Sequence, residues 1–188
     1  MNKVKFGLCN VHIAKIIYGA NDAITYDTPF ALPGAVNLTL DPAGEEVDFR
    51  ADNTSYFKDM GNDGYTGSLE IALVTDDFKT KILGLTTDAN GALFENADDS
   101  IKDFALGFQI DGDKENRKYW LYSVKASRPS VSSKTTEKSK EPVTETLNIT
   151  ATARSTDKQV KVELAPTAEN KTAYDGFFDQ VYEKLISG

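Results

Sequence analysis

The stretch FALGFQIDGDKENRKYWLYSVKA, residues 104–126, holds two alternating segments around a polar turn. A period of two places successive side chains on opposite faces of a strand. In the first segment the apolar positions are Phe104, Leu106, Phe108 and Ile110. The DGDKEN between the segments, residues 111–116, is rich in turn-forming residues. The stretch therefore predicts a β-hairpin with strands over 104–110 and 118–126.

The second strand of this hairpin carries large apolar side chains at both parities. Alternation places on one face Trp120, Tyr122, Val124 and Ala126, and on the other Tyr119, Leu121, Ser123 and Lys125. A strand exposed on one side has polar residues at every second position. We therefore expect this strand to be covered on both faces.

Similar alternation continues on both sides of the hairpin, over residues 36–40, 68–73, 147–153 and 160–164, and residues 11–17 also look like a strand. One polar and one apolar face per strand is typical of antiparallel sheets. Turn formers at Asp41-Pro42-Ala43-Gly44 are expected to separate two short strands. The pattern predicts a mainly β fold, an antiparallel β-sandwich or half-barrel, in a single domain over residues 1–188.

Two segments read as short α-helices that flank the sheet. In the first, Asp76 or Asp77 can cap a helix in which Phe78 and Ile82 are four residues apart, and Gly84 ends it. Near the C-terminus, spacings of three and four relate six apolar residues, which are Phe177, Phe178, Val181, Tyr182, Leu185 and Ile186.

Two stretches are long for loops inside a compact domain. Residues 51–66 are rich in turn formers and carry four large apolar side chains, Tyr56, Phe57, Met60 and Tyr65. Residues 127–142 hold Val131 as their one large apolar side chain and join two strands that we expect to pair. Long connections of this kind are usually functional or become ordered on a partner. A flexible loop without a partner is the alternative for 127–142.

Composition and charge narrow the function classes. The formal net charge is −8, and an acidic surface repels phosphate, which argues against sequence-directed nucleic-acid binding. The single cysteine, Cys9, excludes an intrachain disulfide and fits a reducing cytosol. We expect no signal peptide and no membrane segment, since the apolar runs are strand-sized.

Motifs for catalysis are missing from the sequence. There is no phosphate-binding glycine motif and no nucleophile elbow, and one histidine with one cysteine cannot supply a typical zinc site. His12 lies in an expected strand, where a packed or surface role is far more common than a catalytic one. The segment starting at Asp111 fails as a calcium loop because Asn116 replaces the required glycine. We therefore expect no catalytic, cofactor-binding or metal-binding residues, and no enzyme.

Several stretches, in order along the chain, resemble the phi13-type family of siphophage major tail proteins. They are VKFGLCNVHIAKI (4–16), TYDTPFALPGAVNLTLDPAGEEVDFRADN (25–53), GYTGSLEIALVTDDFKTKILG (64–84), FALGFQIDGDKENRKYWLY (104–122), ASRPSVSSKTTEKSKEPVTETLNITATAR (126–154) and AYDGFFDQVY (173–182). The resemblance covers nearly the whole chain. It shows no C-terminal immunoglobulin-like domain of the kind that some tail proteins carry.

The resemblance implies a virion protein that forms hexameric rings, which stack into a hollow tail tube. Its partners would be further copies of itself, a tape-measure protein in the lumen, and tail-tip initiator and tail-terminator proteins. Phage DNA would pass through without specific binding, and assembly would take place in the cytoplasm of the bacterial host. No cofactor and no membrane are implied.

The two long stretches are the expected contacts between copies. Candidate contact residues are Tyr56, Phe57, Met60 and Tyr65 in the first, and Arg128, Val131, Lys134 and Lys138 in the second. Two other functions fit the same pattern. One is a β-sandwich binding or capsid-decoration module, and the other is the tube subunit of a contractile injection system.

Overall fold

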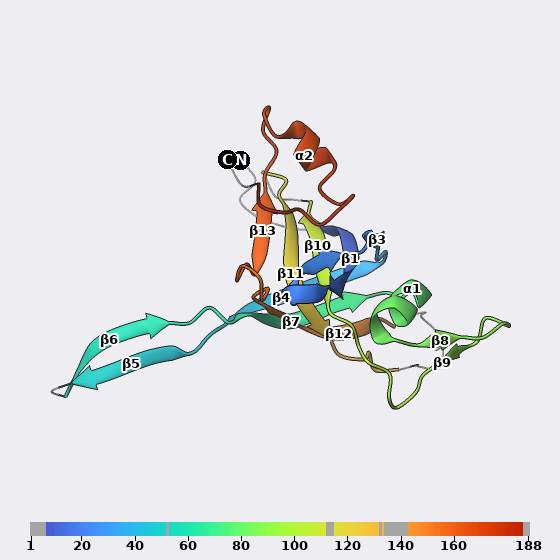
Figure 1. Ribbon diagram of the computed structural model, residues 1–188, viewed down its shortest axis with the longest axis horizontal. Helices are drawn as coiled ribbons and strands as arrows, with labels where there is room; N and C mark the ends of the chain where they lie inside the picture. Colours follow the sequence, from blue (N-terminus) through green and yellow to red (C-terminus); the bar gives the residue numbers. More distant parts are fainter. Residues whose placement is uncertain (1–6, 52, 112–114, 132, 134–142, 186–188) are drawn as a thin grey trace, which may run out of the picture.

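The computed structural model describes residues 7–51, 53–111, 115–131, 133 and 143–185, without the side chains of residues 46–51 and 55–60. Its main element is a nine-stranded antiparallel sheet in the order β2-β1-β10-β11-β12-β7-β4, with β13 on β11 and β3 on β1 (Figure 1). These strands are β1 (Leu8–Tyr18), β2 (Ile24–Tyr26), β3 (Phe30–Ala31), β4 (Ala35–Ala43), β7 (Gly64–Ile71), β10 (Phe104–Ile110), β11 (Lys118–Ala126), β12 (Glu145–Thr152) and β13 (Lys161–Leu164). The predicted mainly β, antiparallel fold is confirmed.

The hairpin of residues 104–126 forms the centre of this sheet. β10 and β11 pair in antiparallel register, with Gly107 opposite Trp120. On its other edge β11 pairs with β13 through its first half and with β12 through its second half. Both predicted pairings, β10 with β11 and β11 with β12 across the 127–142 connection, are therefore present.

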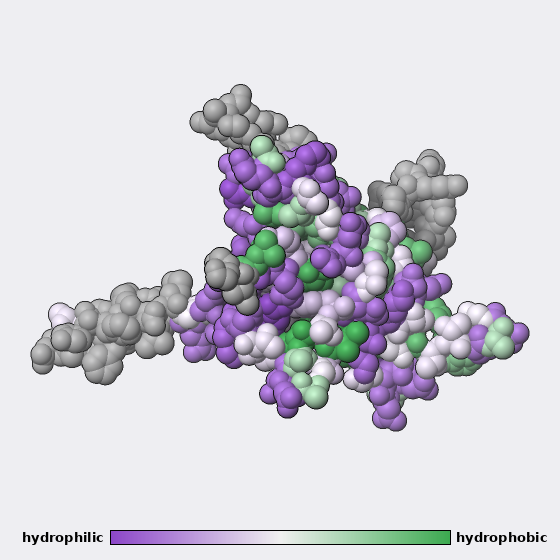
Figure 2. All heavy atoms as spheres, turned by 45° about the horizontal axis from the view of Figure 1, so that its top comes forward, coloured by the Kyte–Doolittle hydropathy of each residue, from purple (hydrophilic) through white to green (hydrophobic). Residues whose placement is uncertain are grey.

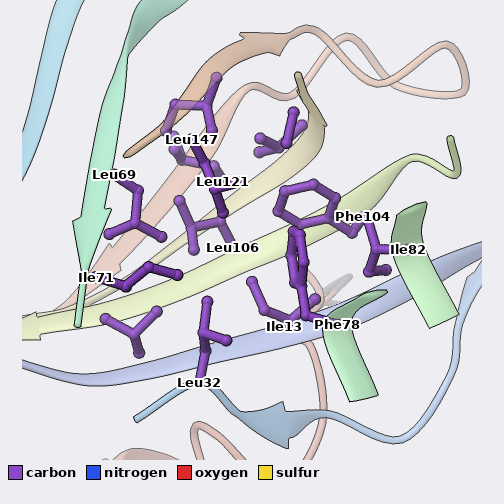
Figure 3. Close-up of a cluster of buried hydrophobic side chains, with 14 of the residues drawn as sticks. Ile13, Leu32, Leu69, Ile71, Phe78, Ile82, Phe104, Leu106, Leu121 and Leu147 are labelled. Carbon is purple, nitrogen blue, oxygen red and sulfur yellow. The ribbon is translucent and has the colours of Figure 1, made fainter. Parts of the chain in front are cut away.

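A cluster of buried side chains fills the concave side of the curved sheet. Figure 3 draws 14 of the buried residues; those that it labels converge from strands, from Leu32 just after β3 and from the helical turn after β7. The labelled residues are Ile13, Leu32, Leu69, Ile71, Phe78, Ile82, Phe104, Leu106, Leu121 and Leu147. Alternation along β12 is regular, with Leu147, Ile149 and Ala151 buried between exposed neighbours.

β11 is buried on both faces, as predicted, but the second half of the strand does not keep the predicted faces. Tyr119 and Leu121 point into the concave core, and Trp120 and Tyr122 join a second cluster on the opposite side. Val124 and Ala126 were expected on the side of Trp120, yet they belong to the concave core. The register against β10 shifts between Leu121 and Val124, and such a β-bulge exchanges the two faces of the strand that follows it.

The second cluster is covered by the C-terminal segment. Here the prediction of a helix over 177–186 is wrong: α2 (Lys171–Asp175) ends before it, and residues 181–185 have no regular structure. Phe177 and Val181 are buried as expected, but Leu185 is 81% exposed. Ile186 lies outside the described residues. We call residues 176–185 the C-terminal strap.

The helical segment after β7 is present with two changes. α1 (Asp76–Phe78) continues as a π-helical turn, η2 (Lys79–Leu83), and Gly84 ends it at φ 89°. The N-cap is Thr75, whose side chain accepts a hydrogen bond from the Phe78 N–H, so the prediction of Asp76 or Asp77 as cap is wrong. Threonine before the first turn offers an oxygen at the position where the free backbone N–H groups begin.

The prediction of a loop over residues 51–66 is wrong. β5 (Glu46–Ala51) pairs with β6 (Thr54–Met60), and β7 begins at Gly64. The expected break at residues 41–44 falls later, because β4 continues to Ala43 and pairs Pro42 with Tyr65. Proline is tolerated there since, among the described strands, β4 has a partner on one edge only.

The remaining short elements lie outside the main sheet. They are η1 (Ala20–Asp22) after β1 and the small hairpin of β8 (Thr86–Thr87) with β9 (Leu93–Phe94). Within the described part of the chain, no helix has the length and apolar character needed to cross a membrane.

Candidate assembly interface

The two connections singled out in the sequence leave the sheet at opposite ends. In an antiparallel sheet, two connections can leave from the same end of the sheet or from opposite ends. The connections in question are the one from β4 to β7 and the one from β11 to β12. Thr150 pairs with both Lys125 and Thr66, so β7 begins at the end of the sheet away from the β11–β12 connection. Figure 1 shows β5 and β6 projecting on one side of the body, with β8 and β9 on the other.

The β5–β6 hairpin, which we call the long arm, extends the β4–β7 pair beyond the body. The Gly61 N–H donates to the Glu45 carbonyl at 3.1 Å and the Asp63 N–H to the Ala43 carbonyl at 2.9 Å, so the ladder continues across the break. The predicted contact residues Tyr56, Phe57 and Met60 lie on β6. Phe57 is opposite Phe49, and the register shifts directly after this pair. Their side chains lie outside the description.

The opposite end is formed by the β8–β9 hairpin and the start of the 127–142 connection, which we call the short arm. Arg128 donates from Nη1 to Glu95 Oε1 at 2.8 Å and so ties the two segments together. Phe94 is 51% exposed and Val131 is 95% exposed, which places apolar surface next to that ion pair. The predicted contact residues Lys134 and Lys138 lie outside the described residues.

Tyr65, the fourth residue predicted for the first stretch, does not lie on the long arm. It belongs to β7 and packs half-buried against the concave core. Lys161 Nζ lies 5.2 Å from the centre of the Tyr65 ring. Both residues line an open groove of about 500 Å³ at the end of the half-barrel from which the long arm projects.

The groove lies where β1 and β4 diverge. Leu8 of β1 is on one wall, and Val36, Leu38 and Leu40 of β4 are on the other. Its floor includes the stacked rings of Phe108 and Tyr119, whose centres are 4.9 Å apart, together with Ile110. Figure 2 shows one face of the molecule, on which hydrophobic side chains gather near the centre of a largely hydrophilic surface.

His12 and Cys9 are the two side chains that the sequence analysis considered for chemistry. His12 stacks on Phe178 with ring centres 4.7 Å apart and planes at 5°, and its Nδ1 lies 2.9 Å from the Asn10 carbonyl oxygen. Cys9 is half-buried, and burial raises the pKa of its thiol. No cluster of three or more His, Cys, Asp or Glu side chains suited to a metal ion occurs among the residues that the structure describes.

Arg154 organises a polar site that the sequence did not reveal. It is 5% exposed and donates to Asp157 Oδ2 at 2.6 Å and to Glu183 Oε1 at 2.6 Å. Its guanidinium carbon also lies 4.4 Å from the centre of the Tyr122 ring. Hydrogen bonding to Asp157 holds the pKa of Arg154 above its usual range, and the same bond lowers the pKa of the Asp157 carboxyl.

This site fixes the C-terminal strap to the sheet. Glu183 belongs to the strap, and side chains of β11 bind strap carbonyls: Trp120 Nε1 donates to Phe177 O and the Tyr122 hydroxyl to Tyr182 O, both at 2.8 Å. Desolvation raises the pKa of the neighbouring Tyr26 hydroxyl to about 12. The one sequence signal for this arrangement is an arginine at the end of an alternating strand, three residues before an aspartate.

Comparisons with known proteins assign this chain to no family. No family model matches the sequence, and no curated protein matches it. Among solved structures, this chain is similar to a chain in "Cryo-EM structure of the anti-feeding prophage (AFP) baseplate, 6-fold symmetrised". The match covers 88% of this chain and 97% of that chain, with a TM-score of 0.44 and 9% sequence identity. These values describe a distant likeness between the two chains.

Proposed function

We propose that this chain is a structural virion protein, the major tail-tube subunit of a siphophage, and that it has no enzymatic activity. Copies form rings, hexameric in the family that the sequence resembles, and the rings stack into a hollow tube. The proposal starts from the sequence resemblance, which runs in order through nearly the whole chain. It also draws on the geometry of the two arms.

The placement of the arms is the observation that carries the proposal. Stacking along an axis needs a head-to-tail contact, in which two different surfaces of one subunit meet on neighbouring copies. The long arm and the short arm lie on opposite sides of the body (Figure 1). A subunit with its contact elements on one side would form a closed dimer more readily than a tube.

The sheet also has open edges for contacts within a ring. Among the described residues, β4 pairs only with β7 and β13 pairs only with β11, so each leaves one edge without a strand partner. Unpaired edges bind further strands, and pairing between copies would bury them. A ring in which each of these edges takes a strand from a neighbouring copy satisfies backbone groups on every copy.

The remaining parts of the proposal concern the lumen and the partners. A net charge of −8 would repel DNA phosphates and let the duplex slide through without binding. Further proposed partners are a tape-measure protein, a tail-tip initiator and a tail terminator, with assembly in the host cytoplasm. The tube subunit of a contractile injection system would need the same arms and edges. This function is the alternative to the proposed one.

Removal of the long arm tests the proposal. Because Gly61 N–H bonds to the Glu45 carbonyl, residues 46–60 can be replaced by a two-residue Asn-Gly turn that keeps this pair. We expect a variant whose buried Trp120 gives the same fluorescence spectrum as in the wild type but that forms no tubes in negative-stain electron microscopy, while the wild type forms rings or tubes. Light scattering gives the mass of each species in solution.

A mixing experiment tests the head-to-tail contact itself. The variant keeps the short arm, so a small fraction of it should bind one end of a growing wild-type tube and stop growth there. Mean tube length should then fall as the variant fraction rises. Normal tubes from the variant alone would contradict the assignment of the long arm. A wild type that stays monomeric even with a tail-tip complex added would favour the binding-module alternative.

A further inference from the structure

The groove between β1 and β4 has the properties of a strand-binding slot. β1 pairs with β10 on one edge, and on its other edge it pairs with β3 from His12 and with β2 from Ile16. No described strand pairs with that second edge over Leu8–Asn10. The facing edge of β4 is equally unpaired within the described residues. The slot thus offers backbone donors and acceptors from two walls.

Backbone geometry at the slot entrance shows which groups are available. The Asp111 N–H donates to the Gly7 carbonyl at 2.7 Å, so the N–H and C=O of Gly7 face β10. Successive residues of a strand direct these groups to opposite edges. The N–H and C=O of Leu8 therefore face the slot, where an added strand could bond to them.

Side chains in the slot favour an alternating, partly apolar strand. Val36, at 52% exposure, and the half-buried Leu38 and Leu40 offer apolar contacts on one wall. Lys161 and Glu163 supply charge at the rim. In an added strand that alternates large apolar and charged residues, the apolar side chains would contact the Phe108–Tyr119 floor. The charged side chains would point into solvent.

Residues 1–6 of this chain have that pattern. Val4 and Phe6 alternate with Lys3 and Lys5, which makes the segment basic on a chain whose net charge is −8. The segment precedes Gly7, which itself lines the groove. Six extended residues span about 20 Å, the length of an ordinary strand.

We propose that the slot between β1 and β4 binds residues 1–6 of a second copy of this chain by β-strand addition. The chain's own segment is a poor occupant, because at Gly7 the backbone still runs along β10 and would have to reverse. Exchange of this segment between copies would close the half-barrel of each subunit with its neighbour's chain.

This proposal rests on the proposed function only in that copies of the chain meet, and site-directed cross-linking tests it separately. In a Cys9→Ser background, Val4→Cys and Val36→Cys are made as two single variants, mixed, and treated with a short thiol-to-thiol cross-linker. We expect a covalent dimer in the mixture. Thr39→Cys is the matched control: it is exposed on the same strand but does not line the groove, so its dimer yield should be at least ten-fold lower.

The outcomes separate the two proposals. Adding Phe6→Asp to the Val4→Cys variant should reduce the dimer about ten-fold by removing the apolar contact. Tubes without a dimer in the mixture would overturn the strand exchange and leave the tube function intact. A link formed only within the double variant Val4→Cys/Val36→Cys would show that the chain fills its own slot and would also overturn the exchange. A dimer in the mixture without tubes would support the exchange and count against the tube.

Discussion

Gly107 lies opposite Trp120 in the β10–β11 ladder, on the face covered by the C-terminal strap. A Cβ atom at position 107 would come within 2.9 Å of the indole ring. The indole is fully buried and holds Phe177 O through its Nε1, so it has little room to move. The absence of a side chain at this one residue is what lets the second face pack.

A methyl group at position 107 should therefore destabilise the fold. We expect Gly107→Ala to lower the free energy of unfolding by about 1–3 kcal/mol, the usual cost of overpacking a filled core. Urea denaturation followed by tryptophan fluorescence measures this change. Gly61→Ala is the control, since a Cβ there meets atoms only at 3.6 Å or beyond, and it should change stability by less than about 0.5 kcal/mol. Equal effects of the two substitutions would refute the packing argument.

Residue types alone did not reveal the bulges of the sheet. In β11, alternation assigned Val124 and Ala126 to the wrong face, because one extra residue between Leu121 and Val124 exchanges the two sides. A similar shift occurs in β1 between Cys9 and His12, where Asn10 has φ 52°. Asparagine tolerates this left-handed conformation better than most residues, but several asparagines in the chain adopt ordinary angles.

At the scale of elements, the C-terminal strap shows a segment whose structure is set by its partner. Its apolar spacing is helical, yet hydrogen bonds from Trp120 and Tyr122 bind the carbonyls of Phe177 and Tyr182. A helix would use those carbonyls internally and would carry the apolar residues of the strap on one narrow stripe. Burial of Phe177 and Val181 against β1, β10 and β11 is achieved by the irregular path instead.

The Arg154 site makes the stability of the fold dependent on pH. Arg154 lowers the pKa of Asp157 below its ordinary 3.8, so the carboxylate stabilises the folded state above that value, and this contribution is lost as pH falls through the folded pKa. Asp157→Asn should thus reduce the melting temperature at neutral pH, and the gap to the wild type should narrow below about pH 4. Thermal unfolding from neutral to acidic pH measures it. A gap that stays constant across this range would show that the ion pair contributes nothing through its charge.

For the whole molecule, charge opposes the proposed assembly, and apolar or backbone contacts favour it. Copies with a net charge of −8 repel one another, and salt screens that repulsion. We expect the assembled fraction to rise as NaCl is raised from about 0.02 M to about 0.5 M, a range over which the screening length falls well below the spacing of surface charges. Sedimentation of tubes at each salt concentration gives this fraction, with sucrose at matched osmolality as control. Dissolution of tubes by salt would indicate an interface held by ion pairs.

The sequence by itself determined the class of the fold and most of its strands. Alternation is local information, since it depends only on which residues share a face, so the hairpin of β10 and β11 and the strands β4, β7, β12 and β13 were predicted from it. The sequence also determined the acidic charge and indicated, through Gly84, where the first helical segment ends. These properties need no knowledge of distant residues.

Only the tertiary structure decided how these elements meet. Residues 51–66 carry turn formers, but pairing with residues that precede them turns most of that stretch into strand. The opposite placement of the two arms, the Arg154 site and the slot between β1 and β4 each join residues far apart in the chain. Such contacts depend on sheet order, curvature and bulges, which arise from the packing of all strands together and leave no periodic mark on any one of them.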